Sequence, residues 1–340
     1  MATIRDVAKQ ANVSIATVSR IINRKGKYST KTEQKVNEAI EKLGYTTNVI
    51  AKKLKTGTTR TIGLVTCEFR LLHSSQLIST SIKKLISNGF SVEIVLDKTL
   101  QECALLFNQG RYDGLLIIDG HRDESALKLL IESDRRFVLL GGNIEREDVN
   151  LVEIDYFSGG YIATKQLIRM GHTKILFIED KLPNYAMEEI RRGYLFALDE
   201  HGISYSDDLL KKNINYNLLT KERLGYTILK ESIASTSFSS VFTTDDKIAY
   251  GVIMGIKELG LSIPDDLSVI GFGNLSPSAY IIPPLTTIEV PSEQMAELGA
   301  EILINNIRRQ DSIVKSVKLK PQLIERESLT KKCKEIDSNN

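Results

Sequence analysis

The chain has 340 residues, a length that suits two or three domains. Hydrophobic residues make up 42% and charged residues 26%, an ordinary balance for a soluble globular protein. No apolar run reaches the roughly 18 residues needed to span a membrane. The opening MATIRDVAKQ lacks the apolar segment of a secretory signal. We therefore expect a cytoplasmic protein that has no membrane partner.

The cysteines exclude two further classes. Cys67, Cys103 and Cys333 are odd in number and lie far apart. This spacing fits neither a disulfide framework nor a zinc site, so we expect a reducing compartment and no bound metal or cofactor.

The net charge of +2 hides a strong asymmetry along the chain. Residues 1–60 hold 13 basic and 4 acidic side chains, a net charge of +9, which leaves −7 for the remainder. A basic head on a mildly acidic body indicates an anionic partner for the head, and nucleic acid fits through phosphate contacts. A solvated basic surface is the alternative that charge alone leaves open.

The first 45 residues are predicted to form three short helices. Each begins after a side chain that can cap a helix, and the last ends at Gly44, which suits a C-cap. The helices are Ile4–Gln10 after Thr3, Ile15–Asn23 after Ser14, and a third that begins at Ser29 or Thr30.

After a polar, basic connector at residues 46–60, buried strands alternate with helices. This alternation predicts parallel sheets with ligands at the carboxyl ends of the strands. Eight strands are predicted, enough for two sheets with a cleft between them, and no internal repeat is evident. The strands are Ile62–Thr66, Val92–Leu96, Gly114–Ile118, Phe137–Leu140, Leu151–Ile154, Ile175–Ile178, Ser240–Thr243 and Val269–Phe272. Helices between them include Gln76–Asn88, Gly159–Met170 and Glu188–His201.

The opening helices follow the helix-turn-helix plan, in which the second helix enters the major groove of DNA. Ile15 and Ala16 stand at the start of that helix and point out of the fold, where apolar side chains can meet thymine methyl groups. Arg20, one turn on, can reach a guanine edge, and nearby hydroxyls can bind phosphate. The alternative is a three-helix bundle with an incidental polar face, in which an exposed Ile would be odd. The predicted DNA contacts here are Thr3, Ser14, Ile15, Ala16, Thr17, Ser19, Arg20 and Asn23.

These residues resemble the lactose/galactose repressor family of bacterial helix-turn-helix transcriptional regulators. The resemblance runs from TIRDVAKQANVS, ATVSR and EKLGY through NVIAKKLKTGTTRTIGLV to TTDDKIAYGVI, PDDLSVIGFGN, PPLTTIEVP and LIERES, over about residues 2–328. It implies an all-α helix-turn-helix headpiece plus an α/β periplasmic-binding-protein-like domain of two parallel-sheet subdomains. The expected divisions are a headpiece at 1–45, a hinge helix and linker at 46–60, an effector-binding and dimerisation domain at 61–330, and a disordered tail at 331–340.

The resemblance also assigns roles in the hinge. Leu54 would insert into the minor groove at a central base step. The free-energy cost of unstacking the bases there is offset by a DNA bend that buries more protein surface. Ala51 and Lys55 would follow the groove beside it, and Lys52 would lie near the phosphates. The residues alone favour the alternative that Leu54 is a minor packing residue, since lone exposed leucines are common.

The large domain should hold a small-molecule effector, a sugar or sugar phosphate, in the cleft between its subdomains. Two hallmark positions of the family are changed, because Ile190 stands for an arginine that clamps the effector and Gly273 for an aspartate. These changes leave a typical free-sugar site open to question. The effector contacts that the resemblance implies are His73, Ser74, Asn143, Arg191, Asp246 and Asn274.

Two other classes fit less well. An enzyme would be expected to show a phosphate loop, a zinc-binding helix or a nucleophile elbow, and none of these motifs is present. A transported sugar-binding protein would not need a basic headpiece. We therefore expect a regulator, by default a repressor of sugar-utilisation genes, that is not an enzyme and binds a near-palindromic operator as a homodimer.

The homodimer should not assemble further, because the chain after Leu329 carries only Ile336 as an aliphatic residue and cannot supply a coiled-coil seam. The family resemblance places the dimer contacts near Gln76–Lys84 and Pro284–Thr287.

Overall fold

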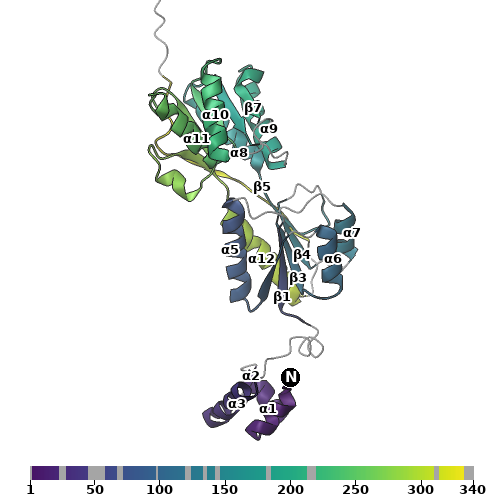
Figure 1. Cartoon of the computed structure of the whole chain (residues 1–340). Coiled ribbons are helices and arrows are strands. Elements are labelled where there is room, and N and C mark those ends of the chain that lie inside the picture. The colour runs from purple at the N-terminus through teal and green to yellow at the C-terminus, as the bar shows by residue number, and fades with distance from the viewer. Residues whose placement is uncertain are drawn as a thin grey trace, which may run out of the picture. The chain divides into compact units, whose positions relative to one another are not determined.

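The computed structural model divides the chain into two compact units, Met1–Arg60 and Thr61–Asn340 (Figure 1). It describes residues 2–22, 28–44, 58–66, 72–96, 99–118, 124–132, 136–141, 146–180, 185–212, 220–309 and 314–332. The side chains of residues 72–74, 124, 212 and 309 lie outside this description.

Three helices form the described part of the small unit, as the sequence predicts. They are α1 (Ile4–Ala11), α2 (Ile15–Ile22) and α3 (Thr30–Leu43). Thr3 and Ser29 cap α1 and α3 with their side chains, and Gly44 ends α3 at φ 55°, a conformation that favours glycine. The core is small and consists of Val7, Ala8, Ala11, Val18, Ile21, Val36 and Ala39.

The first half of the large unit is built on a six-stranded sheet in which all strands are parallel. Its strands, in sheet order, are β11 (Ser316–Leu319), β5 (Leu151–Ile154), β4 (Phe137–Leu140), β3 (Gly114–Ile118), β1 (Thr61–Thr66) and β2 (Ser91–Leu96). Alternate strand residues face opposite sides, and each side buries its own apolar cluster. Helices α5 (Leu72–Ser87) and α12 (Ser292–Arg309) cover one side, and α6 (Leu100–Asn108) and α7 (Glu124–Glu132) cover the other (Figure 1).

The second half repeats this layering. Its strands, in sheet order, are β12 (Gln322–Ile324), β10 (Thr286–Glu289), β9 (Ser268–Gly273), β8 (Ser240–Thr243), β6 (Ile175–Glu179) and β7 (Leu210–Lys212). All pairs are parallel except β10 with β12. Helices α8 (Tyr156–Arg169) and α9 (Tyr185–Glu200) cover one side, and α10 (Lys221–Ile233) and α11 (Asp246–Glu258) cover the other.

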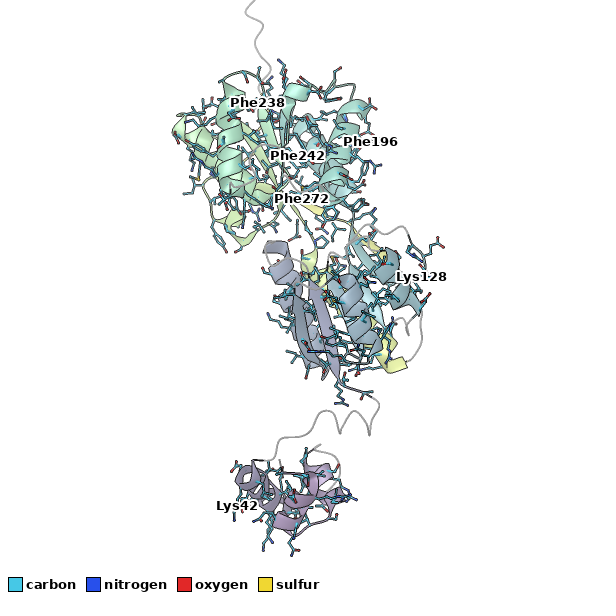
Figure 2. The ribbon with its side chains drawn as sticks, turned by 45° about the vertical axis from the view of Figure 1, so that its right-hand side comes forward. Lys42, Lys128, Phe196, Phe238, Phe242 and Phe272 are labelled. Atoms are coloured by element: carbon cyan, nitrogen blue, oxygen red, sulfur yellow. The ribbon has the colours of Figure 1, made fainter. Side chains whose placement is uncertain are left out.

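The chain passes between the two halves three times, at β5 to α8, at β10 to α12 and at β11 to β12. Tyr156 and Val290 lie at two of these crossings and pack against the cores of both halves. In the second half, Phe242 is fully buried and meets Phe177 edge-on at 5.2 Å between ring centroids. Figure 2 shows Phe242 inside this half and Phe196 on its outer helix.

The two helix pairs of the second half share a short pattern of contacts. In each pair a glycine on one helix lies against the backbone of the other, where a Cβ would come within 2.2 Å of a carbonyl oxygen. Each pair also carries a tyrosine that donates to a glutamate across the pair, with a lysine beside it. The matched residues are Gly160, Gly193, Tyr161, Lys165 and Glu200 on α8 and α9, and Gly225, Gly251, Tyr226, Lys230 and Glu258 on α10 and α11.

The eight predicted strands are all present, with ends shifted by at most one residue. Four further strands, β7, β10, β11 and β12, were not predicted. They are three or four residues long, and the sequence of each lacks a continuous buried apolar run, which is why periodicity does not reveal them.

The C-terminal segment docks against the second half through His172. The ring is buried, with Nδ1 2.9 Å from the Ser239 hydroxyl and Nε2 3.1 Å from the carbonyl oxygen of Thr330. Because a carbonyl only accepts, Nε2 carries the proton and Nδ1 accepts from Ser239. The N–H of Lys332 donates to the carbonyl of Met170 at 2.8 Å. The expected disordered tail therefore cannot begin at residue 331, and residues 333–340 lie outside the described part.

We predict that acid weakens this docking. Burial lowers the pKa of His172 below 6.5, so the folded chain favours the neutral ring. The contribution to stability is present above pH 6.5 and is lost as pH falls through the folded pKa. His172→Gln cannot titrate, so its gap in melting temperature below wild type should narrow between pH 8 and pH 5.5. His201→Gln serves as the control, and a gap that stays constant across this range would contradict the prediction.

Candidate nucleic-acid interface and effector site

The start of α2 presents apolar side chains to solvent. Ser14 precedes the helix, and its hydroxyl oxygen accepts from the backbone N–H of Thr17 at 3.1 Å. This cap sets the helix so that Val18 and Ile21 enter the core while Ile15 stays 45% exposed and Ala16 is exposed beside it. Neither Ile15 nor Ala16 belongs to the apolar core of the described part of the small unit.

Polar side chains flank this pair along the same helix. Arg20 is exposed one turn further on, and Thr17 and Ser19 are half-buried. Thr3 stands at the start of α1, where its hydroxyl donates to Asp6 at 2.7 Å and this hydrogen bond lowers the pKa of Asp6. The predicted contacts Asn23, Ala51, Lys52, Leu54 and Lys55 lie outside the described residues.

In the large unit, two ion-pair clusters lie at the carboxyl ends of the strands of the second sheet. Lys221 begins α10 and lies between two carboxylates, 2.9 Å from Asp180 after β6 and 2.7 Å from Asp245 after β8. Burial alone lowers the pKa of Lys221, but the carboxylates of Asp245 and Asp180 outweigh burial and raise the pKa above its usual value. This edge therefore carries charged groups that satisfy one another.

The second cluster joins Arg191 of α9 to Glu179 at the end of β6. Both Glu179 oxygens lie 2.7 Å from Arg191 Nη1, and the carboxylate is almost fully buried. Ile190 is fully buried in the core and so cannot act as a clamp at its own position. Arg191 points to this edge of the sheet, as an effector contact requires, but it already has a partner.

Asp246, a predicted effector contact, does not reach this edge. It is fully buried, and its carboxylate accepts from the Leu275 N–H at 2.7 Å and from the hydroxyls of Ser278 and Thr287 at 2.6 and 2.5 Å. Burial raises its pKa to about 6, although these hydrogen bonds act in the opposite direction. The carboxylate therefore belongs to the interior of the second half, and the preceding Asp245 is the residue that faces the edge.

Asn274 is also occupied. Its side-chain oxygen accepts from Arg326 at 2.7 Å, and its side-chain nitrogen donates to Glu289 at 2.8 Å. This network ties the end of β9 to β10 and to the segment after β12. The remaining predicted effector contacts cannot be placed, because Asn143 and the side chains of His73 and Ser74 lie outside the described residues.

Sequence reasoning predicted Arg191 at this edge and missed the four charged residues that lie around it. Glu179, Asp180, Lys221 and Asp245 end strands or begin helices at one rim. The signal was present as adjacent acids directly after apolar runs, in ILFIED and VFTTDD. Adjacent acids cannot be separated by periodicity, because the start of a helix is uncertain by one residue.

Exposed large apolar side chains lie at several places on the large unit, and two groups of them are candidates for partner contacts. Ile86 of α5 and Ile94 and Leu96 of its neighbour β2 are 57%, 40% and 42% exposed. In the second half, Met254, Tyr280 and Ile282, here called the pairing patch, are 61%, 82% and 76% exposed. Leu285, Thr286 and Thr287 are fully buried and cannot contact a partner. The exposed residues near the predicted contact segment Pro284–Thr287 are Tyr280 and Ile282, which precede it.

Within the described part of the chain, no helix combines the length and apolar character needed to cross a membrane. The small unit presents apolar and basic side chains on a capped helix, as a DNA-binding unit does. The large unit has two layered α/β halves with charged groups at the strand ends, as a ligand-binding domain does. Together they define a DNA-binding regulator with a ligand-binding domain.

Comparison with known proteins gives the family. Residues 3–48 match bacterial regulatory proteins of the lacI family, and residues 164–329 match the periplasmic binding protein-like domain. The HTH-type transcriptional repressor PurR of Histophilus somni is 30% identical over 335 residues, which cover 97% of this chain and 99% of that protein. The chain belongs to the lacI family of bacterial regulatory proteins. It is a DNA-binding transcriptional repressor of that family with an effector-binding domain.

Solved structures agree with the fold. The transcriptional regulator CelR in complex with cellobiose is 25% identical, with a TM-score of 0.69 and coverage of 96% of this chain and 100% of that one. The lac repressor dimer bound to operator and an anti-inducer is 23% identical, with a TM-score of 0.80 and coverage of 97% and 99%. At 23% identity, the similarity to the lac repressor shows the fold alone.

We predict that Lys221 is needed for the stability of the large unit. Lys221→Met keeps the apolar stem but leaves Asp180 and Asp245 as buried carboxylates without their cation, which should cost about 3 kcal/mol of unfolding free energy. Lys230→Met on the same helix removes an exposed pair with Glu258 and should cost at most about 1 kcal/mol. Urea denaturation of both variants measures the difference, and equal losses would contradict the prediction.

Proposed function

We propose that this chain represses sugar-utilisation genes by binding a near-palindromic operator as a homodimer, and that a small molecule at the carboxyl edge of its sheets controls this binding. The observation that carries the DNA-binding part is the start of α2, where Ile15 and Ala16 stand in solvent with Arg20 exposed one turn on. Apolar side chains suit thymine methyl groups, and a guanidinium suits a guanine edge.

Burial of the apolar surface supports the homodimer. The pairing patch and the group on α5 and β2 expose large apolar side chains on both halves of the large unit. Pairing with a second copy of the chain would bury such apolar surface, and the two-fold symmetry of a homodimer matches that of a near-palindrome. The solved lac repressor structure cited above is itself a dimer on its operator.

The charges at the edge of the second sheet favour an uncharged effector. Glu179, Asp180 and Asp245 outnumber Arg191 and Lys221, and each cation already has a carboxylate partner. Neither Arg191 nor Lys221 is left free to pair with an added phosphate, whereas sugar hydroxyls can donate to carboxylates. CelR with cellobiose and an Enterococcus faecium regulator with ribose, both 25% identical to this chain, were solved with such ligands.

A purine is the second candidate, and it rests on the relatives. Curated proteins that match over nearly the whole chain include PurR repressors at about 30% identity, from Histophilus somni and Vibrio atlanticus among others. Control of purine genes is the function that their name implies.

We predict that Ile15 and Ala16 set sequence preference. Replacing them with Tyr and Gln should change the half-site recovered by selection from random DNA, because the new side chains present different groups to base edges. Lys52→Ala is the matched control, since loss of a phosphate contact should weaken all sites alike. Recovery of the wild-type half-site by the double variant would show that other residues read the bases.

We predict that a neutral sugar stabilises the full-length chain. A ligand at about 100 times its Kd adds roughly 2.7 kcal/mol to the free energy of unfolding. A thermal-shift screen of sugars, sugar phosphates and purine bases should find its largest shift with a sugar, and Asp245→Asn should reduce that shift. A larger shift with a purine base would favour the second candidate, and one with a sugar phosphate would contradict the charge argument.

A further inference from the structure

One buried carboxylate fixes the segment that carries most of the pairing patch. Asp246 is fully buried and holds three positions along this segment, at the Leu275 N–H, the Ser278 hydroxyl and the Thr287 hydroxyl. These positions stand at the beginning, the turn and the end of the chain that runs from β9 to β10. Hydrogen bonds to a charged group are among the stronger ones in proteins, so three of them fix this path closely.

The exposed residues sit on a small loop that closes at Ser278. The N–H of Leu285 donates to the Ser278 carbonyl at 2.8 Å, and the loop between them holds Tyr280 and Ile282. Ile281 turns inward and packs against the core of this half, while Tyr280 and Ile282 remain 82% and 76% exposed. The side chain of Ser278 therefore anchors the base of a loop whose outer residues are apolar.

The rest of the patch is tied to the same anchor through α11. The Tyr250 hydroxyl lies 2.7 Å from the Ser278 hydroxyl, and Met254 follows Tyr250 by one turn of the helix. Gly271 of β9 leaves room for the carboxylate, since a Cβ there would lie 2.3 Å from an Asp246 oxygen. α11 thus supplies the carboxylate, the tyrosine and one residue of the patch.

We propose that Asp246 is a positioning residue for pairing, which fixes the Leu275–Thr287 segment so that Tyr280 and Ile282 meet a second copy of the chain. This proposal rests on the proposed function, in which two copies pair through the patch. Its basis is geometric, because a carboxylate with no exposed surface cannot take a ligand, and its three donors all lie on the segment that carries the patch. A loop held in place before association loses less conformational freedom when a partner binds, which favours affinity.

Sedimentation equilibrium of the full-length chain tests the proposal through the dimer Kd. Ser278→Ala removes one donor and the partner of Tyr250, and we expect the Kd to rise on the order of tenfold. Ser276→Ala in the same short helix (Ser276–Ala279) is the control, because Ser276 is exposed and should leave the Kd unchanged. Thr287→Val should also raise the Kd, and Thr287→Ser, which keeps the hydroxyl, should restore it. Amide exchange at Tyr280 should speed up only in the variants that lose a donor.

A second pair of variants separates this inference from the function on which it depends. Tyr280→Ser and Ile282→Ser change the patch itself and should weaken pairing in either case. If they do so while Ser278→Ala and Thr287→Val keep the wild-type Kd, Asp246 does not position the patch and the inference fails alone. If wild type is monomeric at every concentration, or the patch variants leave its Kd unchanged, the proposed pairing fails and the inference fails with it.

Discussion

The start of α11 is the constraint on which the second half of the large unit depends. Asp245 and Asp246 are consecutive, and helix geometry sends consecutive side chains in different directions. Asp245 caps the helix and meets Lys221 at the edge of the sheet, while Asp246 enters the interior and meets the segment after β9. One turn of helix therefore fixes both the charged edge where an effector would bind and the loop that exposes Tyr280.

Burial of charge at that edge demands pairing. A carboxylate removed from water is costly unless a cation or several donors satisfy it. Glu179 with Arg191, and Asp180 and Asp245 with Lys221, meet this demand within the chain. Asp246 meets it with hydrogen bonds alone, and its pKa is raised to about 6, because no cation among the groups that shift it offsets burial.

Much of the fold could be predicted from the sequence, and the failures have physical causes. Central parallel strands such as Gly114–Ile118 are buried on both faces and read as apolar runs. β11, with the partly exposed sequence SVKL, lies at the edge of its sheet and carries no such run. The candidate effector contacts were harder to predict. Whether Asp245 or Asp246 faces the edge depends on the residue at which α11 begins and on hydrogen-bond donors far along the chain, such as Thr287. The two glycines of one helix pair, Gly160 and Gly193, are further apart in the sequence than Gly225 and Gly251 of the other pair. No single sequence period therefore marks the shared contacts.

The two units differ in how closely sequence specifies structure. In the small unit the decisive contacts span three residues, as between Thr3 and Asp6 or between Ser14 and Thr17. Local pattern therefore places its helices almost to the residue. In the large unit the chain crosses three times between halves, and Asp246 meets Thr287 across 41 residues. Such contacts form only when the whole topology is in place. For that reason the exposed start of α2 could be predicted from the sequence, whereas the hydrogen bonds around Asp246 required the structure.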